Sequence, residues 1–435
     1  MAQQKAAAII ELHNVCKAFA KPSGEPLPVL KDIDLAITEG EILGLLGRSG
    51  CGKSTLLRIA GGLIKPTSGE VLYRGAPLAG PAEGIAVVFQ TFALYPWLTV
   101  LDNVELGLDA LKLSQDEERR RSMSAIDLIG LDGFQSAYPR ELSGGMRQRV
   151  GFARALVSDP TLLLMDEPFS ALDVLTAETL RTDFLDLWIA RQLPTKAVLM
   201  VTHNIEEAVL MCDRILVLGA NPGHIAAAIP VSLPQPRNRL DAAFHAIVDE
   251  IYTILTSRMT EAIGAQSQIH GGLAQHLSPV STNRIGGFAE TLAAPPYGGS
   301  AELAKIAVPL SFDINDLLPI AAALHILEFA EVKEGTIKLT AAGRVFAQGD
   351  IEQRKRLFRE HLVRFVPLAA HIRQVLDERE GHEAPRARFE FELQDHLNQN
   401  DADSTLQAVI GWGRYAELFI YDDRTRTFSL DHGET

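Results

Sequence analysis

Continuous and alternating apolar runs divide the first 220 residues into two kinds of predicted strand. Continuous runs lie at 42–46, 162–165 and 198–201. Such runs are typical of strands buried on both faces of a parallel sheet. Residues 9–19 and 29–37 alternate instead, as antiparallel strands with one solvated face do. Helical spacing begins at Leu56 and recurs at 111–129, so the pattern as a whole predicts an α/β fold.

The first continuous run leads into a glycine-rich loop that matches the phosphate-loop motif G-x-x-x-x-G-K-[ST]. Its residues are Gly47, Arg48, Ser49, Gly50, Cys51, Gly52, Lys53, Ser54 and Thr55. The glycines allow successive backbone N–H groups to face one hollow, beside the positive end of the following helix. Lys53 adds a charge for the β- and γ-phosphates, and the Ser54 hydroxyl is a suitable Mg²⁺ ligand.

Two adjacent acids, Asp166 and Glu167, close the buried run at 162–165. Paired carboxylates at the end of a buried strand seldom have a purely structural role. Asp166 suits the Mg²⁺ shell, and Glu167 suits the general base that activates water for attack on the γ-phosphate.

Gln90, His203 and Phe19 each have a structural and a functional interpretation. Gln90 is either a surface amide or a group at a strand end that binds Mg²⁺ and positions the attacking water. His203 follows the run at 198–201, and we favour a γ-phosphate contact over a structural histidine. Phe19 is either a core residue at a strand end or an aromatic side chain that stacks on a purine base.

Ser143, Gly144 and Gly145 begin a predicted helix. A hydroxyl and bare backbone N–H groups at the positive end of a helix form a second anion-binding end. The presence of two such ends beside one phosphate loop raises the question whether the second serves the nucleotide of another subunit.

Composition limits the classes of function. The length of 435 residues predicts two or three domains, and the net charge of −14 argues against a general nucleic-acid-binding surface. Three widely spaced cysteines fit no metal pattern and suit a reducing compartment. Apolar windows fall short of the roughly 18–20 residues of a spanning helix, so we expect a cytoplasmic protein that needs a partner for any membrane role.

The region after residue 261 has a different pattern. Residues 262–300 are rich in Gly, Ser, Pro and Gln, and predict a flexible linker between domains at 1–261 and 301–435. In the last domain, a helix at 314–327 precedes a strand, turn and strand at 330–339 and a further helix, the outline of an α+β winged-helix module. Roughly 16 Lys and Arg accompany 23 Asp and Glu there, a balance that opposes DNA binding.

The order of these motifs resembles the ATP-binding cassette (ABC) ATPases over roughly residues 8–260. The resemblance rests on residues 142–148, Leu-Ser-Gly-Gly-Met-Arg-Gln, which match the family signature Leu-Ser-Gly-Gly-x-x-Gln. It implies a P-loop NTPase fold with antiparallel β and helical subdomains, and ATP with Mg²⁺ as cofactors. The roles that it assigns are adenine stacking to Phe19, Walker A to Gly47–Thr55, the Q-loop to Gln90, Walker B and the catalytic base to Asp166 and Glu167, the D-loop to Ala171-Leu172-Asp173, and the switch histidine to His203.

Members of this family work as head-to-tail dimers, in which residues equivalent to Ser143, Gly144 and Gly145 close on the nucleotide of the other subunit. The resemblance therefore implies a homodimer or a sister cassette.

Residues 91–104 and the basic, Pro-rich segment 233–239 resemble ATPases that drive import of nitrate, sulfonates, taurine or bicarbonate. This implies a peripheral position on the cytoplasmic face of the bacterial inner membrane, with permease subunits as partners and a periplasmic solute-binding protein as an indirect one. The segment after Gln90 would receive the permease, and Trp97 is either part of that groove or a core aromatic. The last domain resembles the AAA-associated C-terminal domain, for which we expect a regulatory or docking role.

The leading hypothesis is the ATP-hydrolysing subunit of an ABC importer for a small anion. The alternative is an ATP-switched clamp without transport, whose second domain binds an effector. The coiled-coil insertions of repair cassettes and the tandem Walker A loops of translation-factor cassettes do not occur in this sequence.

Overall fold

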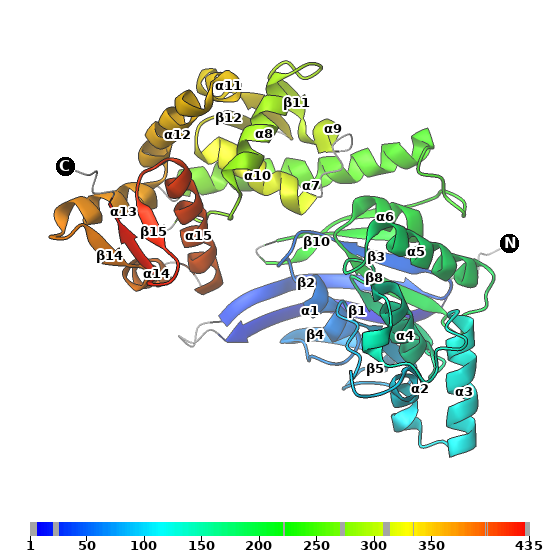
Figure 1. Cartoon of the computed structure of the whole chain (residues 1–435). Coiled ribbons are helices and arrows are strands. Elements are labelled where there is room, and N and C mark those ends of the chain that lie inside the picture. Colours follow the sequence, from blue (N-terminus) through cyan, green and yellow to red (C-terminus); the bar gives the residue numbers. More distant parts are fainter. Residues whose placement is uncertain are drawn as a thin grey trace. The chain divides into compact units, whose positions relative to one another are not determined.

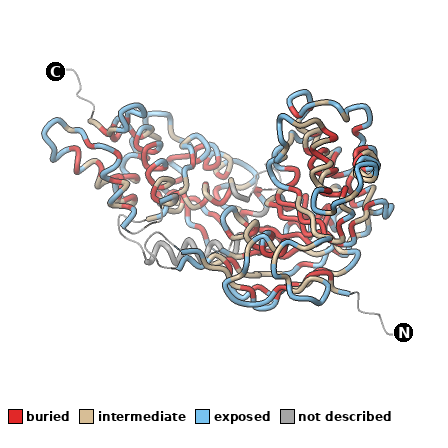
Figure 2. Tube along the Cα trace, turned by 90° about the horizontal axis from the view of Figure 1, so that it is seen from below, coloured by how far each residue is buried: buried red, intermediate tan, exposed pale blue. Residues whose placement is uncertain are grey.

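The computed structural model describes residues 7–20, 26–220, 222–269, 275–307, 314–333, 335–395, 397 and 399–430. The chain forms two compact units, Met1–Ile251 and Tyr252–Thr435, which divide within helix α7 (Ala242–Ile269) (Figure 1). Buried residues gather in the interior of each unit (Figure 2).

A six-stranded sheet forms the centre of the first unit. Its strands lie in the order β10 (His224–Pro230), β9 (Arg214–Gly219), β3 (Ile42–Leu46), β8 (Ala197–Thr202), β7 (Leu162–Asp166) and β6 (Ile85–Val88). All neighbouring pairs are parallel except β9 and β10. Every residue of β3, β7 and β8 is buried, which confirms the strands predicted from the continuous runs.

A second, antiparallel sheet contains the two alternating runs. Its order is β2 (Pro26–Thr38), β1 (Ala8–Ala20), β4 (Ser68–Tyr73) and β5 (Ala76–Pro77). One face of this sheet is buried through Ile10, Leu12 and Ile33, and these residues share a hydrophobic core with the central sheet. The structure therefore shows the expected antiparallel β subdomain.

Some helices of the first unit pack against the central sheet, and others pack on one another as a helical subdomain. The helices of this unit are α1 (Lys53–Ala60), α2 (Val100–Glu105), the 3-10 helix η1 (Leu106–Leu111), α3 (Gln115–Leu128), the 3-10 helix η2 (Pro139–Glu141), α4 (Gly144–Leu156), α5 (Val174–Ile189) and α6 (Ile205–Met211). The helix predicted at 111–129 is shorter than expected, because Ser114 caps α3 and η1 ends before it.

The second unit contains one arrangement twice. The first copy comprises α8 (Thr282–Ala293), β11 (Ser300–Glu302), α9 (Leu303–Ala307), α10 (Ile314–Ile326), β12 (Ala330–Lys333) and β13 (Thr336–Leu339). The second comprises α13 (Pro367–Glu378), β14 (Glu383–Pro385), α14 (Arg386–Gln394), α15 (Gln399–Tyr415), β15 (Ile420–Asp422) and β16 (Thr427–Ser429), with α11 (Ala341–Gln348) and α12 (Ile351–Phe365) between the copies in the chain. The strand orders, β11-β13-β12 and β14-β16-β15, correspond. The winged-helix-like fold is confirmed, and its repetition was not predicted.

The flexible linker expected at 262–300 is wrong where helices occupy it, at 262–269, the end of α7, and at 282–293, which is α8. Helix α8 buries Ile285, Phe288 and Leu292, and it packs against α10 and α11 within the second unit. These residues have helical spacing, which the Gly- and Pro-rich surroundings obscured. Residues 270–274 of the expected linker lie outside the described residues.

Candidate functional site

The phosphate loop joins the buried strand β3 to helix α1. Gly52 precedes the helix with a φ of 99°, a conformation that favours glycine. Lys53 is buried, and its Nζ donates to the carbonyl oxygens of Gly47 and Arg48 at 2.6 and 2.9 Å. The ammonium group is therefore held against the loop, where it can bind phosphate oxygens.

The remaining loop residues have simpler positions. Ser49 and Gly50 form the turn, and Thr55 lies in the first turn of α1. Cys51 is buried, and burial raises the pKa of its thiol. We therefore expect Cys51 to contribute its backbone rather than a thiolate to the site.

Ser54 and Asp166 bring two oxygen ligands together. The Ser54 hydroxyl donates to Oδ1 of Asp166 at 3.0 Å, and burial raises the pKa of this carboxyl group. Among the described residues, no group of three or more His, Cys, Asp or Glu side chains forms a preformed metal site. A Mg²⁺ ion fits Ser54 and Asp166, because it commonly takes one or two carboxylates and completes its shell with phosphate oxygens and water.

Glu167 lies between two of the predicted site residues. Its Oε2 accepts a hydrogen bond from Nε2 of Gln90 at 3.0 Å and lies 3.2 Å from Nδ1 of His203. The hydrogen bond from His203 lowers the pKa of Glu167, whereas burial raises that of the adjacent Asp166. Neighbouring carboxyl groups with opposite pKa shifts are typical of divided catalytic roles. Glu167 is thus ready to accept a proton at neutral pH.

Phe19 is not a core residue, because it is 41% exposed near the end of β1. Nζ of Lys17 lies 4.9 Å from the centre of its ring. An exposed aromatic face is compatible with base stacking.

A second cluster lies at the N-termini of α4 and α5. Ser143 caps α4 by accepting from the N–H of Met146 at 3.2 Å, and Asp173 caps α5 by accepting from the N–H of Thr176 at 3.1 Å. Gly144 and Gly145 follow Ser143, and a Cβ atom on Gly145 would lie 2.3 Å from Cγ2 of Thr176. Close packing of the two helices therefore requires glycine at that position.

This second cluster is linked to the strand-end cluster through Gln148, the last residue of the signature. Its Nε2 donates to the carbonyl oxygen of Pro168, one residue after Glu167, at 2.6 Å. Direct contacts between Ser143 and the phosphate loop do not occur among the described residues. The structure thus brings together Ser54, Gln90, Asp166, Glu167 and His203, and leaves Ser143 and Asp173 apart from them.

A groove of about 470 Å³ is lined in part by the residues that come directly after Gln90 in the sequence. Phe92, Leu94 and Arg147 contribute to its lining, and Arg154 donates to the carbonyl oxygen of Phe92 at 3.1 Å. Trp97 is 68% exposed beside Tyr95, so its interpretation as a core residue is wrong.

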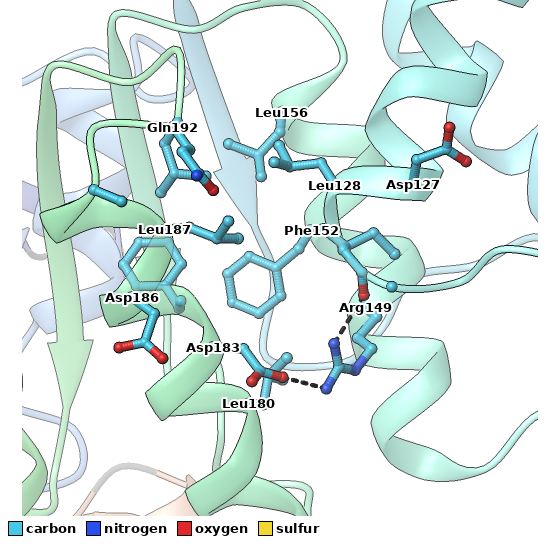
Figure 3. Close-up of a pocket in the computed structure, with 15 residues that line it drawn as sticks. Asp127, Leu128, Arg149, Phe152, Leu156, Leu180, Asp183, Asp186, Leu187 and Gln192 are labelled. Atoms are coloured by element: carbon cyan, nitrogen blue, oxygen red, sulfur yellow. Dashed lines mark hydrogen bonds and ion pairs between the residues drawn. The ribbon is translucent and has the colours of Figure 1, made fainter.

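Another pocket, of about 480 Å³, lies among α3, α4 and α5 (Figure 3). Phe152 and Leu156 line its apolar part. Its guanidinium group, from Arg149, is already paired with Asp183 and with the carbonyl oxygen of Ile129. The described site residues do not line this pocket, which is therefore separate from the predicted nucleotide site.

The sequence pattern alone did not identify Thr202 and Glu207 as residues near the site. Glu207 is buried beside His203 and accepts a hydrogen bond from Thr202. The available signal was the helix cap at Asn204, whose side chain accepts from the N–H of Glu207.

Within the described residues, none of the helices combines the length and the apolar character that crossing a bilayer requires.

Two regions of this chain match known protein families, and several known proteins are similar to it. Residues 30–170 match the ABC transporter family, and residues 304–422 match the C-terminal AAA-associated domain. An uncharacterized ABC transporter ATP-binding protein of Methanocaldococcus jannaschii is 41% identical over 254 residues, 58% of this chain and 94% of that protein. The nitrate import ATP-binding protein NrtD of Synechocystis is 41% identical over 261 residues, 58% of this chain and 97% of NrtD. The taurine import ATP-binding protein TauB of Burkholderia pseudomallei is 48% identical over 201 residues, 46% of this chain and 76% of TauB.

Each of the first two relatives is matched over nearly its whole length at 41% identity. This chain therefore belongs to the ATP-binding proteins of the ABC transporter family.

Proposed function

We propose that this chain is the ATP-hydrolysing subunit of an importer for a small anion such as nitrate, a sulfonate, taurine or bicarbonate. The arrangement at Glu167 is the observation that carries the hydrolytic part of the proposal. A carboxylate with a lowered pKa, held by Gln90 and His203, follows directly after the Mg²⁺ ligand Asp166. The solute class is supported by the names of the nitrate and taurine import relatives.

In this mechanism Lys53 and the loop N–H groups bind the β- and γ-phosphates. Ser54 and Asp166 would hold Mg²⁺, and the bound ion would supply positive charge that neutralises charge developing on the phosphate oxygens. Gln90 orients the attacking water and Glu167 accepts its proton. His203 holds Glu167 in its ionised form and contacts the γ-phosphate.

ATP also acts between subunits in this proposal. Ser143, Gly144 and Gly145 of a second cassette contact the γ-phosphate held by the first, and Asp173 lies at the same interface. The separation of the two clusters within one chain supports this arrangement, because an anion-binding helix end would otherwise have no ligand. The second cassette is either a copy of this chain or a sister protein.

The groove lined by Phe92, Leu94 and Arg147 receives a segment of a membrane-embedded permease. The chain is then a peripheral protein on the cytoplasmic face of the membrane, and a periplasmic solute-binding protein acts on it only through the permease. The second unit is proposed to regulate hydrolysis. An ATP-switched clamp without transport has less support, because the relatives whose names state a process, NrtD and TauB, are named as import proteins.

Co-purification tests the transport role. The tagged chain, extracted from its native membranes in mild detergent, should retain a permease subunit identified by mass spectrometry. A cassette dimer that forms with ATP but recovers no membrane protein would instead support the clamp.

A further inference from the structure

A buried carboxylate, Glu207, lies beside the loop that carries His203, and the proposed hydrolysis does not use it. Glu207 is 6% exposed near the start of α6. Its Oε2 accepts a hydrogen bond from the Thr202 hydroxyl at 2.5 Å, and its Oε1 accepts from Nη1 of Arg181 at 3.1 Å. Burying a charge is unfavourable unless such partners compensate it, so the group needs an explanation.

The hydrogen bonds of Glu207 join Thr202 and Asn204, the two chain neighbours of His203, in one closed ring. The Thr202 hydroxyl accepts from the N–H of Asn204 at 3.1 Å while it donates to Glu207. The N–H of Glu207 in turn donates to Oδ1 of Asn204 at 2.9 Å. His203 is the residue between Thr202 and Asn204, so both of its peptide neighbours are fixed. The imidazole extends from this hydrogen-bonded segment, and its Nδ1 lies 3.2 Å from Oε2 of Glu167.

Arg181 connects this ring to helix α5, which begins after Asp173. Arg181 also contacts Glu178 on the same helix at 2.7 Å, and Arg239 contacts that carboxylate at 2.9 Å. The position of the ring is thus tied to the helix that follows the D-loop.

We infer that Thr202 and Glu207 are positioning residues for His203 and that Arg181 ties their position to α5. The inference rests on the proposed function, in which His203 and Glu167 act at the γ-phosphate.

Steady-state ATP hydrolysis by full-length Thr202→Val tests this inference. Valine keeps the volume of threonine and removes the hydroxyl. We expect kcat to fall by roughly 10- to 100-fold, as misplacement of a catalytic group does, with KM for ATP changed by less than about twofold. Thr202→Ser keeps the hydroxyl and should restore kcat. Thr195→Val is the matched control, because Thr195 is also buried and its hydroxyl has no hydrogen-bond partner among the described residues. Wild-type kcat in Thr202→Val would overturn the inference.

A double-mutant cycle separates positioning from general stability. If Thr202 acts through His203, then Thr202→Val should lower kcat no further in a His203→Ala background. A full additional loss in that background would overturn the inference.

A charge-free variant tests the ion pair. Glu207→Gln alone removes one of the acidic partners of the buried Arg181 and leaves it paired with Glu178. The Arg181→Met/Glu207→Gln protein keeps the test interpretable if the single variant does not fold. We expect the folded double variant to show the same loss of kcat, and wild-type kcat would overturn the role of Glu207.

Glu167→Gln separates this inference from the proposed function. Wild-type turnover in Glu167→Gln would refute the proposed mechanism itself. An inactive Glu167→Gln beside a fully active Thr202→Val would refute only the positioning role.

Discussion

The side-chain amide of Gln90 donates a hydrogen bond to Oε2 of Glu167 at 3.0 Å. His203 approaches the same oxygen from the other side. The strand order explains this, because β7, which ends just before Glu167, lies between β6 and β8, which precede Gln90 and His203. The catalytic carboxylate proposed for this protein is therefore held by one group from each neighbouring strand.

Gln90→Glu should raise the pKa of Glu167, because a second carboxylate would face it in place of an amide donor. In a plot of kcat against pH, the fall in kcat on the acidic side should then occur at a higher pH than in wild type. Gln90→Ala, which removes the hydrogen bond without adding a charge, is the control and should shift this fall less. Identical profiles for the two variants would show that Gln90 does not influence Glu167 electrostatically.

Glu167→Gln should reduce ATP hydrolysis by roughly 10²- to 10⁴-fold, because glutamine cannot accept the proton of the attacking water. ATP binding should persist, and light scattering should show a dimer that remains closed in ATP. Glu39→Gln makes the same change at an exposed turn and should behave as wild type. Phosphate release at the wild-type rate from Glu167→Gln would exclude Glu167 as the base.

The free energy of unfolding of His203→Ala should differ from that of wild type by an amount that depends on pH. The hydrogen bond from His203 lowers the pKa of Glu167 in the folded protein. Its stabilisation, about 1 kcal/mol after allowance for solvent, is therefore present above the unfolded pKa of roughly 4.3 and is lost as pH falls through the lower folded pKa. Urea unfolding at neutral and acidic pH should show the difference narrowing in acid. A difference that stays constant would contradict this linkage.

Gly145→Ala should lower stability by about 1–3 kcal/mol, as overpacking commonly does, and should impair hydrolysis at the same time. The added Cβ would lie 2.3 Å from Cγ2 of Thr176, so that side chain or the helix must move. Thr176→Ser removes this methyl group and should rescue the Gly145→Ala protein in both thermal unfolding and ATPase assays. If Thr176→Ser does not rescue the protein, the effect of Gly145→Ala does not arise from the contact with the Thr176 methyl group. Gly144→Ala offers a comparison, because its Cβ would meet only Leu172 at an ordinary 3.6 Å.

Removal of residues 263–435 should leave a folded protein with basal ATP hydrolysis, because the first unit has its own core. If the second unit regulates the cassette, the full chain and the shortened chain should differ in kcat or in its dependence on ATP. Circular dichroism and phosphate release check the two parts of this prediction. Loss of folding would show instead that the second unit is needed structurally.

The sequence by itself determined the local chemistry of this protein. The phosphate loop, the signature and the pair Asp166 and Glu167 are contiguous motifs, and their function depends on backbone conformations that neighbouring residues specify. The buried strands were also readable, because a parallel strand covered on both faces must be apolar along its whole length. The first winged-helix copy was visible for a similar reason, because its strands alternate and Thr340 caps the helix that follows them.

Tertiary structure alone decided which distant residues meet. The placement of Gln90 and His203 on opposite sides of Glu167 follows from strand order, which the local pattern does not contain. Arg181 on α5 and Glu207 on α6 are 26 residues apart in the sequence, and each of them in isolation is expected to be a solvated charge. Helix α8 and the second winged-helix copy were missed because short amphipathic elements are stable only when they pack on partners far along the chain.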